Sequence, residues 1–223
     1  MNLFHLLIIP VLLYLIWISW GSLPRLIFAL DPSRLRYQFV DMSDEEPAAT
    51  TVNRFSEIVG QLQQLGFRRL GLKTEKLPLW SSTIYEISLA SPDHHAFASL
   101  IKDPKRCVYY FYTPFTNGAI LLTAGSGAAF PAIQREDCVQ QVSVYDSPEL
   151  VLAAHQEQLQ HFTATGLVPC SSYTQESRLD ATRQYYAAPA IRRIARQRGI
   201  FELVALLFPI SLIVILAFLG SRG

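Results

Sequence analysis

The sequence predicts an α+β fold: an antiparallel meander of five or six strands covered by helices, flanked by one transmembrane helix at each terminus. Two observations predict it. Long apolar runs stand at both ends of the 223-residue chain. Between them, segments that alternate like strands are preceded and followed by segments with helical spacing, and this order is typical of a sheet with helices on one face.

The two terminal runs, 3–20 and 203–219, are almost entirely apolar. A helix rises about 1.5 Å per residue, so roughly 17 to 20 residues match a hydrocarbon core about 30 Å thick. The first run lacks the basic start and small-residue cleavage site of a signal peptide, which favours a retained anchor. We therefore expect residues 1–23 to form one transmembrane helix. Residues 190–223 are expected to form a basic juxtamembrane segment and a second such helix.

Arginines flank both runs on the side of the central domain. They are Arg25, Arg34, Arg36, Arg192, Arg193, Arg196 and Arg198. Because basic residues near spanning helices stay on the cytoplasmic side, the sequence predicts an integral, two-pass protein in the lipid bilayer. Its central domain would be cytoplasmic, and both termini would lie on the opposite side.

The central part divides into a linker and a domain. Residues 24–50 are predicted to be an interfacial segment followed by an acidic linker that contains Glu45-Glu46. Residues 51–189 are predicted to be the α+β domain. A helix is expected at 52–65, where apolar residues recur at helical spacing and Gly66 fits the position after the last turn.

Six segments have the alternation or composition of strands. They are 67–73, 83–89, 96–101, 107–113, 119–123 and 139–145. Cys107 to Thr113 is the strongest, because nearly every residue is β-branched or aromatic. Asn117-Gly118 offers the positive φ angles of a tight hairpin turn to the strand that follows.

Two further helices are expected after the strands. Ser147-Pro148-Glu149 supplies an N-cap, a proline in the first turn and an early acid, so a helix begins there and ends before Gly166. Another helix is predicted at 175–188, where Pro189 follows. From 190 the basic segment is expected to continue into the last helix.

Charge and cysteine content exclude some classes of function. The net charge is +1, whereas nucleic-acid binding needs a concentrated basic face. The three cysteines, Cys107, Cys138 and Cys170, have no CxxC spacing and leave one over if any two pair in a disulfide, which suits a reducing compartment. No nucleic-acid partner is predicted.

Histidines are the first candidates for chemistry. Asp93, His94 and His155 could combine in a metal site, but His155 and His161 are six residues apart rather than the four that place two ligands on one helix face. His5 could ligate a haem or chlorin inside the first apolar run. Surface histidines and a headgroup contact explain these residues more simply, so no metal or cofactor site is predicted.

Other motifs also have simpler explanations. Gly125-Ser126-Gly127 lacks the strand and helix context of a nucleophile elbow and reads as a flexible loop. The acidic pairs Glu45-Glu46 and Glu136-Asp137 fall in predicted loops, where solvated charge is usual. Glu202 is expected to pair with Arg198 or to reach the interface. No catalytic residue is predicted.

Aromatic residues of the strongest strand point to both faces of the sheet. Core packing explains one face, whereas the other either meets a helix or presents tyrosines to a partner or an apolar ligand. A closed pocket lined by Tyr85, Phe97 and Phe111 would favour ligand binding.

The leading functional hypothesis is a non-catalytic, membrane-anchored interaction module, an accessory or assembly subunit whose partners are other membrane-protein subunits. Anchoring a small domain beside the bilayer would raise its effective concentration for such a partner. The alternative is a membrane-surface domain that binds a lipid or another apolar molecule. An enzyme is a third hypothesis, which convergence of His94, His155 and an acid in a cleft would favour.

Overall fold

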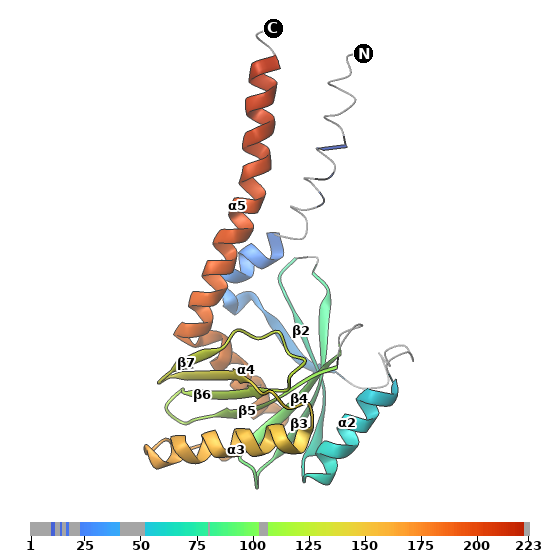
Figure 1. The fold of residues 1–223 in the computed structure, drawn as a ribbon, viewed down its shortest axis with the longest axis vertical. Coiled ribbons are helices and arrows are strands. Elements are labelled where there is room, and N and C mark those ends of the chain that lie inside the picture. Colours follow the sequence, from blue (N-terminus) through green and yellow to red (C-terminus); the bar gives the residue numbers. More distant parts are fainter. Residues whose placement is uncertain are drawn as a thin grey trace. The chain divides into compact units, whose positions relative to one another are not determined.

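The computed structural model describes residues 23–40, 52–79, 81–102 and 107–220, together with positions 10, 11, 14 and 17 (Figure 1). The chain divides into two compact units. Unit 1 comprises Met1–Leu35, Leu77–Ser82 and Arg192–Gly223, and unit 2 comprises Arg36–Lys76 and Thr83–Ile191.

Unit 2 is built on an eight-stranded mixed sheet in the order β1-β2-β3-β4-β5-β6-β8-β7. Its strands are β1 (Arg36–Val40), β2 (Arg68–Lys76), β3 (Thr83–Ser91), β4 (Ala96–Lys102), β5 (Cys107–Pro114), β6 (Ile120–Ala124), β7 (Ile133–Arg135) and β8 (Cys138–Val142). The α+β class is confirmed, and all six predicted strands are present. The prediction of a purely antiparallel meander of five or six strands is wrong, because the sheet gains a strand at each edge and one parallel pair.

The first additional strand is β1, which lies in the segment predicted to be an interfacial region and linker. It pairs antiparallel with β2, with Arg36 opposite Lys76 and Val40 opposite Leu72. Five residues are too few for alternation to stand out in the sequence. The pairing with β2 therefore defines this strand.

The second additional strand, β7, explains the parallel pair. After β6 the chain forms β7 at the sheet edge, turns at Glu136-Asp137 and returns as β8 between β6 and β7. The Ile120 amide donates to the Asp137 carbonyl over 3.1 Å at the start of the parallel pairing. Inserting β8 in this way makes it parallel to β6 rather than the next strand of a meander.

Helices cover both faces of the sheet, so the prediction that they cover one face is wrong. Helices α2 (Val52–Gln64) and α3 (Pro148–Ala164) pack on one face. Helix α4 (Gln175–Ala187) packs on the other, and Figure 1 shows α3 and α4 on opposite sides of the strands. The three predicted helices lie within two residues of their expected bounds.

The face under α2 and α3 is a conventional apolar core. Its buried members include Leu62 of α2, Val151 of α3, and Leu89, Leu100 and Phe111 of the sheet. Buried aliphatic and aromatic side chains of this size each contribute about 1.5 to 3 kcal/mol. This core holds the strands in register and fixes the face on which α4 docks.

Helix α4 begins with a reciprocal cap. The Ser177 amide donates to Thr174 Oγ1 over 3.2 Å, and the Thr174 amide donates to Ser177 Oγ over 2.7 Å. The buried residues Arg178, Ala181 and Thr182 follow at helical spacing and face the sheet. The cap thus fixes where the Arg178 side chain enters the interior.

Unit 1 contains a short helix at residues 23–30, the 3₁₀ turn η1 (Pro32–Arg34) and all but the first three residues of α5 (Pro189–Gly220). The short helix packs closely on α5: a Cβ built on Gly199 would lie 2.5 Å from the Ala29 Cβ. Beside this contact, Arg25 Nη1 donates to Glu202 Oε1 over 2.7 Å.

The part of the chain that the structure describes contains no helix with both the length and the apolar character needed to cross a bilayer. In α5, four arginines and Glu202 occupy the first half, so its apolar stretch begins only at Leu203. The predicted first helix, 1–23, falls almost wholly outside the described residues. The predictions of flanking transmembrane helices and of an integral, two-pass localisation are therefore contradicted.

Candidate functional site

His155 is the most deeply placed of the histidines considered for chemistry. It is fully buried on α3, with Nε2 2.9 Å from Thr113 Oγ1 and Nδ1 3.0 Å from Thr123 Oγ1. The Thr113 hydroxyl donates to the His95 carbonyl over 2.7 Å, so its oxygen accepts a hydrogen bond from Nε2–H of His155. Burial lowers the pKa of His155 to about 3, which keeps the imidazole neutral.

The other histidines do not join it in a metal site. His94 Nε2 lies 3.0 Å from the Leu65 carbonyl, and its ring stacks on Phe67. His161 is exposed, and His5 lies outside the described residues. Among described positions, no three His, Cys, Asp or Glu side chains are grouped to bind an ion. The arrangement of His94, His155 and an acid that would favour an enzyme is not formed.

The glycine loop after β6 is shaped by packing rather than by flexibility. A Cβ on Gly125 would lie 2.9 Å from the Tyr109 ring, so only glycine fits there. The Tyr109 ring packs against Gly125, and its hydroxyl donates to the Asp146 carbonyl over 2.7 Å. The Glu136-Asp137 pair forms the β7–β8 turn, and Glu45-Glu46 lies outside the described ranges.

The aromatic strand β5 is buried on both faces. Phe111 packs in the core under α2 and α3, whereas the Tyr112 hydroxyl donates to the Ala181 carbonyl of α4 over 2.8 Å. Of the two explanations left open, the second face therefore meets a helix. Phe97 lies opposite Tyr112 and Phe111 lies opposite Ala98 in the β4–β5 register, so Phe97 and Phe111 occupy opposite faces. They cannot line one pocket.

Beneath α4 lies a network of buried ionic side chains that sequence reasoning missed. Glu86 is its centre: Oε2 lies 3.1 Å from Lys73 Nζ, and Oε1 accepts from Arg178 Nη2 over 2.9 Å. Ser99 Oγ and the Tyr110 hydroxyl also donate to this carboxylate, over 2.6 and 2.8 Å. Lys73, Glu86 and Arg178 are each at most 2% exposed.

A second carboxylate balances the charge. Lys73 Nζ donates to Glu75 Oε1 over 2.7 Å, and the Tyr186 hydroxyl donates to Glu75 Oε2 over 2.7 Å. Thr182 accepts from Lys73 Nζ over 3.1 Å and from Arg178 Nη1 over 2.9 Å. The two cations, Lys73 and Arg178, therefore balance the two anions, Glu75 and Glu86. Each of the four groups pairs with another member of the network, and Arg178 connects α4 to the sheet.

The pKa directions follow from this arrangement. Burial alone would raise the pKa of Glu86, but the charges of Lys73 and Arg178 outweigh it and lower the pKa to about 2. Burial would likewise lower the pKa of Arg178, and the Glu86 carboxylate raises it instead. Both groups stay ionised, while burial raises the pKa of Tyr110 well above its usual value. The network is thus a fixed set of charges and hydrogen bonds.

One signal in the sequence could have revealed the network. Lys73 and Glu75 alternate along β2, and both face the side of the sheet that carries Glu86 and Ser88. A polar stripe across neighbouring strands is costly to bury unless partners cover it. Its cationic partner, Arg178, comes 92 residues after Glu86 and could not be identified from spacing.

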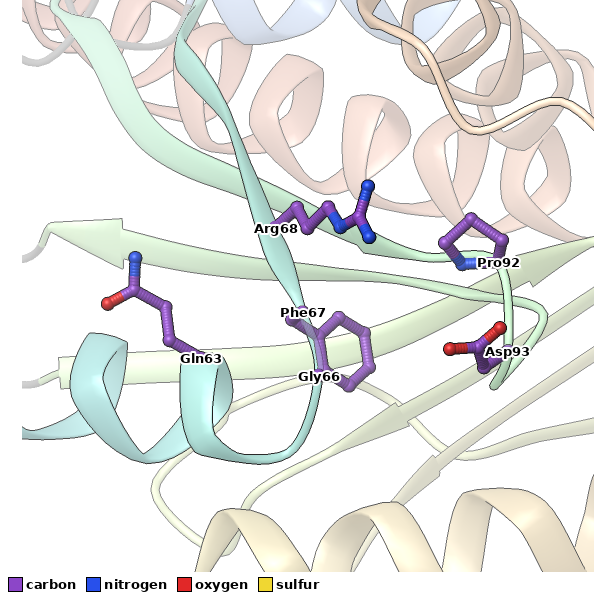
Figure 2. Close-up of a pocket in the computed structure, with 6 residues that line it drawn as sticks. All are labelled: Gln63, Gly66, Phe67, Arg68, Pro92 and Asp93. Carbon is purple, nitrogen blue, oxygen red and sulfur yellow. The ribbon is translucent and has the colours of Figure 1, made fainter.

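Unit 2 also has a small surface pocket of about 330 Å³. Figure 2 shows it between the end of α2, the start of β2 and the β3–β4 turn, lined by Gln63, Gly66, Phe67, Arg68, Pro92 and Asp93. All of these residues except Phe67 are exposed. The pocket lacks the enclosing apolar walls that a lipid-binding site needs.

The most exposed apolar surface among the described residues belongs to α5, and we call it the apolar segment. It consists of Ile200, Phe201, Leu203, Val204, Leu207, Phe208 and Ile215. Phe201 and Phe208 are 80% and 69% exposed. Single exposed apolar residues are common, whereas a set that follows along one helix is a candidate interaction surface.

The arginine segment, formed by Arg192, Arg193, Arg196 and Arg198, directly precedes it on the same helix. All four arginines are exposed. Within the described ranges no ion pair joins any of them to an acidic group. Helix α5 thus presents a cationic region followed immediately by an apolar region, and this juxtaposition is the strongest candidate for a functional surface.

Comparison with known proteins gives no relative from which a function could be transferred. No protein-family model, curated protein or solved structure matches the chain. The functional argument therefore rests on the residues themselves.

Proposed function

We propose that this chain is a non-catalytic interaction module, an accessory or assembly subunit that attaches to a larger protein complex through α5. The observation that carries the proposal is the apolar segment of α5, whose large side chains face solvent. The partner is a subunit that offers an apolar groove, because Phe201, Val204, Phe208 and Ile215 are exposed and recur at the spacing with which one face of a helix fills such a groove.

The free energy available from this surface is comparable to the cost of association. Fully burying one exposed large apolar side chain contributes about 1.5 to 3 kcal/mol, so covering the seven, which are 39 to 80% exposed, contributes about 6 to 12 kcal/mol. Association costs an estimated 4 to 15 kcal/mol in lost freedom of motion. The apolar segment can therefore support specific association when its partner covers most of it.

The state of the polar interior supports a binding role over a catalytic one. Glu86, Lys73 and Arg178 are ionised and paired with one another away from solvent. His155 is neutral between two threonines. Groups that bind one another in this way hold the domain rigid, and a rigid domain presents a constant surface to a partner.

Co-purification of the tagged full-length chain from its native cells tests the proposal. The informative variant is Phe201→Ser/Phe208→Ser, and the matched control is Val144→Ser/Leu150→Ser, which changes two exposed apolar residues of unit 2. We expect a stoichiometric partner with the wild type and the control, reduced at least about tenfold in the α5 variant. Equal recovery in both variants, or no stoichiometric partner, would contradict the proposal.

A further inference from the structure

Two residues of the arginine segment and three of the apolar segment form one continuous stripe on α5. Arg192, Arg196, Ile200, Leu203 and Leu207 follow at steps of three or four residues, so they lie on one side of the helix. Arg193 lies beside the stripe. The stripe therefore changes from cationic to apolar along the helix axis within a single turn.

Among the described residues of unit 1, no ion pair compensates this positive charge. Glu202 is the only carboxylate between the arginines and the end of the apolar segment, and it accepts a hydrogen bond from Arg25. Asp31, the other carboxylate of unit 1, pairs with Arg34. The guanidinium groups of the arginine segment are thus available to an external anion.

We propose that the arginine segment binds the phosphate groups of an anionic phospholipid bilayer, with Ile200, the first apolar residue after it, next to the headgroups. The contact is interfacial and involves no crossing of the bilayer. It deepens the proposed function and rests on it, because α5 would then bring the domain to partner subunits located at a lipid surface.

The order of chemistry along α5 favours a lipid surface over other anions. In a lipid leaflet an anionic phosphate layer lies directly next to an apolar layer, which matches the change from Arg196 to Ile200. A nucleic acid would pair with the arginines but leave the apolar side chains in water. Planar guanidinium groups also bind phosphate through two hydrogen bonds each, which an ammonium group cannot do.

The arginines should make binding depend on lipid charge. Each basic residue near an anionic surface raises the partition coefficient about fivefold, and ions screen this effect beyond about 8 to 10 Å. We expect the full chain, diluted out of detergent, to bind phosphatidylcholine vesicles containing 30% phosphatidylglycerol at least about tenfold more tightly than pure phosphatidylcholine vesicles. The difference should shrink when the salt concentration is raised.

A vesicle flotation assay with two charge-matched variants tests whether the arginine segment causes the preference for anionic vesicles. Arg192→Gln/Arg193→Gln/Arg196→Gln/Arg198→Gln should lose the preference for anionic vesicles. Changing four other exposed arginines to glutamine, at Arg36, Arg68, Arg69 and Arg135, should leave it intact. Equal binding to neutral and anionic vesicles, or equal effects of the two variants, would overturn the inference.

The same two variants separate this inference from the proposed function. If the preference for anionic lipid is absent but co-purification still depends on Phe201 and Phe208, only the lipid inference fails. If co-purification does not depend on those residues, the proposed function fails whatever the vesicles show. Circular dichroism of each variant confirms that a lost signal does not come from unfolding.

Discussion

At the scale of single residues, Glu86 holds α4 on the sheet. Its carboxylate accepts from Arg178 of the helix and lies against Lys73 of the sheet, and all three side chains are buried. Buried ionic groups are costly to desolvate, so a complete network contributes little net stability. Removing one member leaves an unpaired buried charge and is far more costly than the network is stabilising.

Glu86→Gln should therefore lower the free energy of unfolding by about 3 to 5 kcal/mol, because Arg178 loses the carboxylate with which it pairs and Lys73 keeps only Glu75. Urea denaturation measures this change. Glu157→Gln, at an exposed position in the middle of α3, is the matched control and should change stability by less than about 0.5 kcal/mol.

The charge-balanced pair Lys73→Met/Glu86→Gln checks the cause. It removes one cation and one anion, so it should be less destabilising than the sum of the two single substitutions. An additive result would mean that the loss comes from packing rather than from unpaired charge.

His155 should make stability depend on pH. Its folded-state pKa is about 3, below the usual 6.5, so below pH 6.5 the unfolded chain binds more protons than the folded one. The free energy of unfolding should fall as pH is lowered from 6.5 to 5, at up to about 1.4 kcal/mol per pH unit from this group. That window lies above 4.5, the unfolded-state pKa of Glu86, so Glu86 adds only a smaller slope near pH 5.

Urea denaturation across this window should give a smaller slope for His155→Gln than for the wild type. His161→Gln, at an exposed position of the same helix, should keep the wild-type slope. If the slope is the same in all three proteins, another group causes the pH dependence and His155 is not held neutral by burial.

At the scale of elements, Gly199 sets the approach of the helix at residues 23–30 to α5. An added Cβ would meet the Ala29 Cβ at 2.5 Å, which is too close for either helix to accommodate without moving. This contact lies next to the Arg25–Glu202 ion pair. Separating the two helices should weaken both interactions together.

Gly199→Ala should therefore destabilise unit 1 by about 1 to 3 kcal/mol and expose the short helix to protease. Limited trypsin digestion, followed at Arg25 and Arg34, measures this opening. Gly60→Ala is the control, because an added Cβ there has nothing within 4 Å and alanine favours the helix α2. Equal digestion of both variants would mean that Gly199 does not limit the helix contact.

The elements also show which parts of the fold could be predicted from the sequence. Residues 107–113 were predicted as a strand from composition alone, and α3 was predicted from Ser147-Pro148-Glu149, because both signals are local. The edge strand β7 has only three residues, and the position of β8 depends on pairing with β6 rather than on its own sequence. Such non-local pairings leave no spacing pattern to detect.

The same limit applies to the candidate sites. The arginines before 200 and the apolar run after 202 stand out in the sequence because they are contiguous. The ionic network does not, because α4 supplies Arg178 only after the sheet has formed. The prediction that the two apolar runs span a membrane is contradicted, because the described part of the chain contains no helix that is long and apolar enough to do so.

At the scale of the whole molecule, the two units differ in what they bury and what they expose. Unit 2 is held together by an apolar core on one face of its sheet and an ionic network on the other. Unit 1 carries α5, whose apolar segment faces solvent. The central claim is that this segment is covered by a partner when the chain is in its native setting.

Site-specific photocrosslinking in native cells tests that claim most directly. A benzoyl-phenylalanine is placed at Phe201, and in a separate chain at Val144 of unit 2, which is 84% exposed and serves as the control. We predict one discrete crosslinked partner from Phe201 and none from Val144. The absence of a discrete adduct from Phe201, or the same adducts from both positions, would contradict the account.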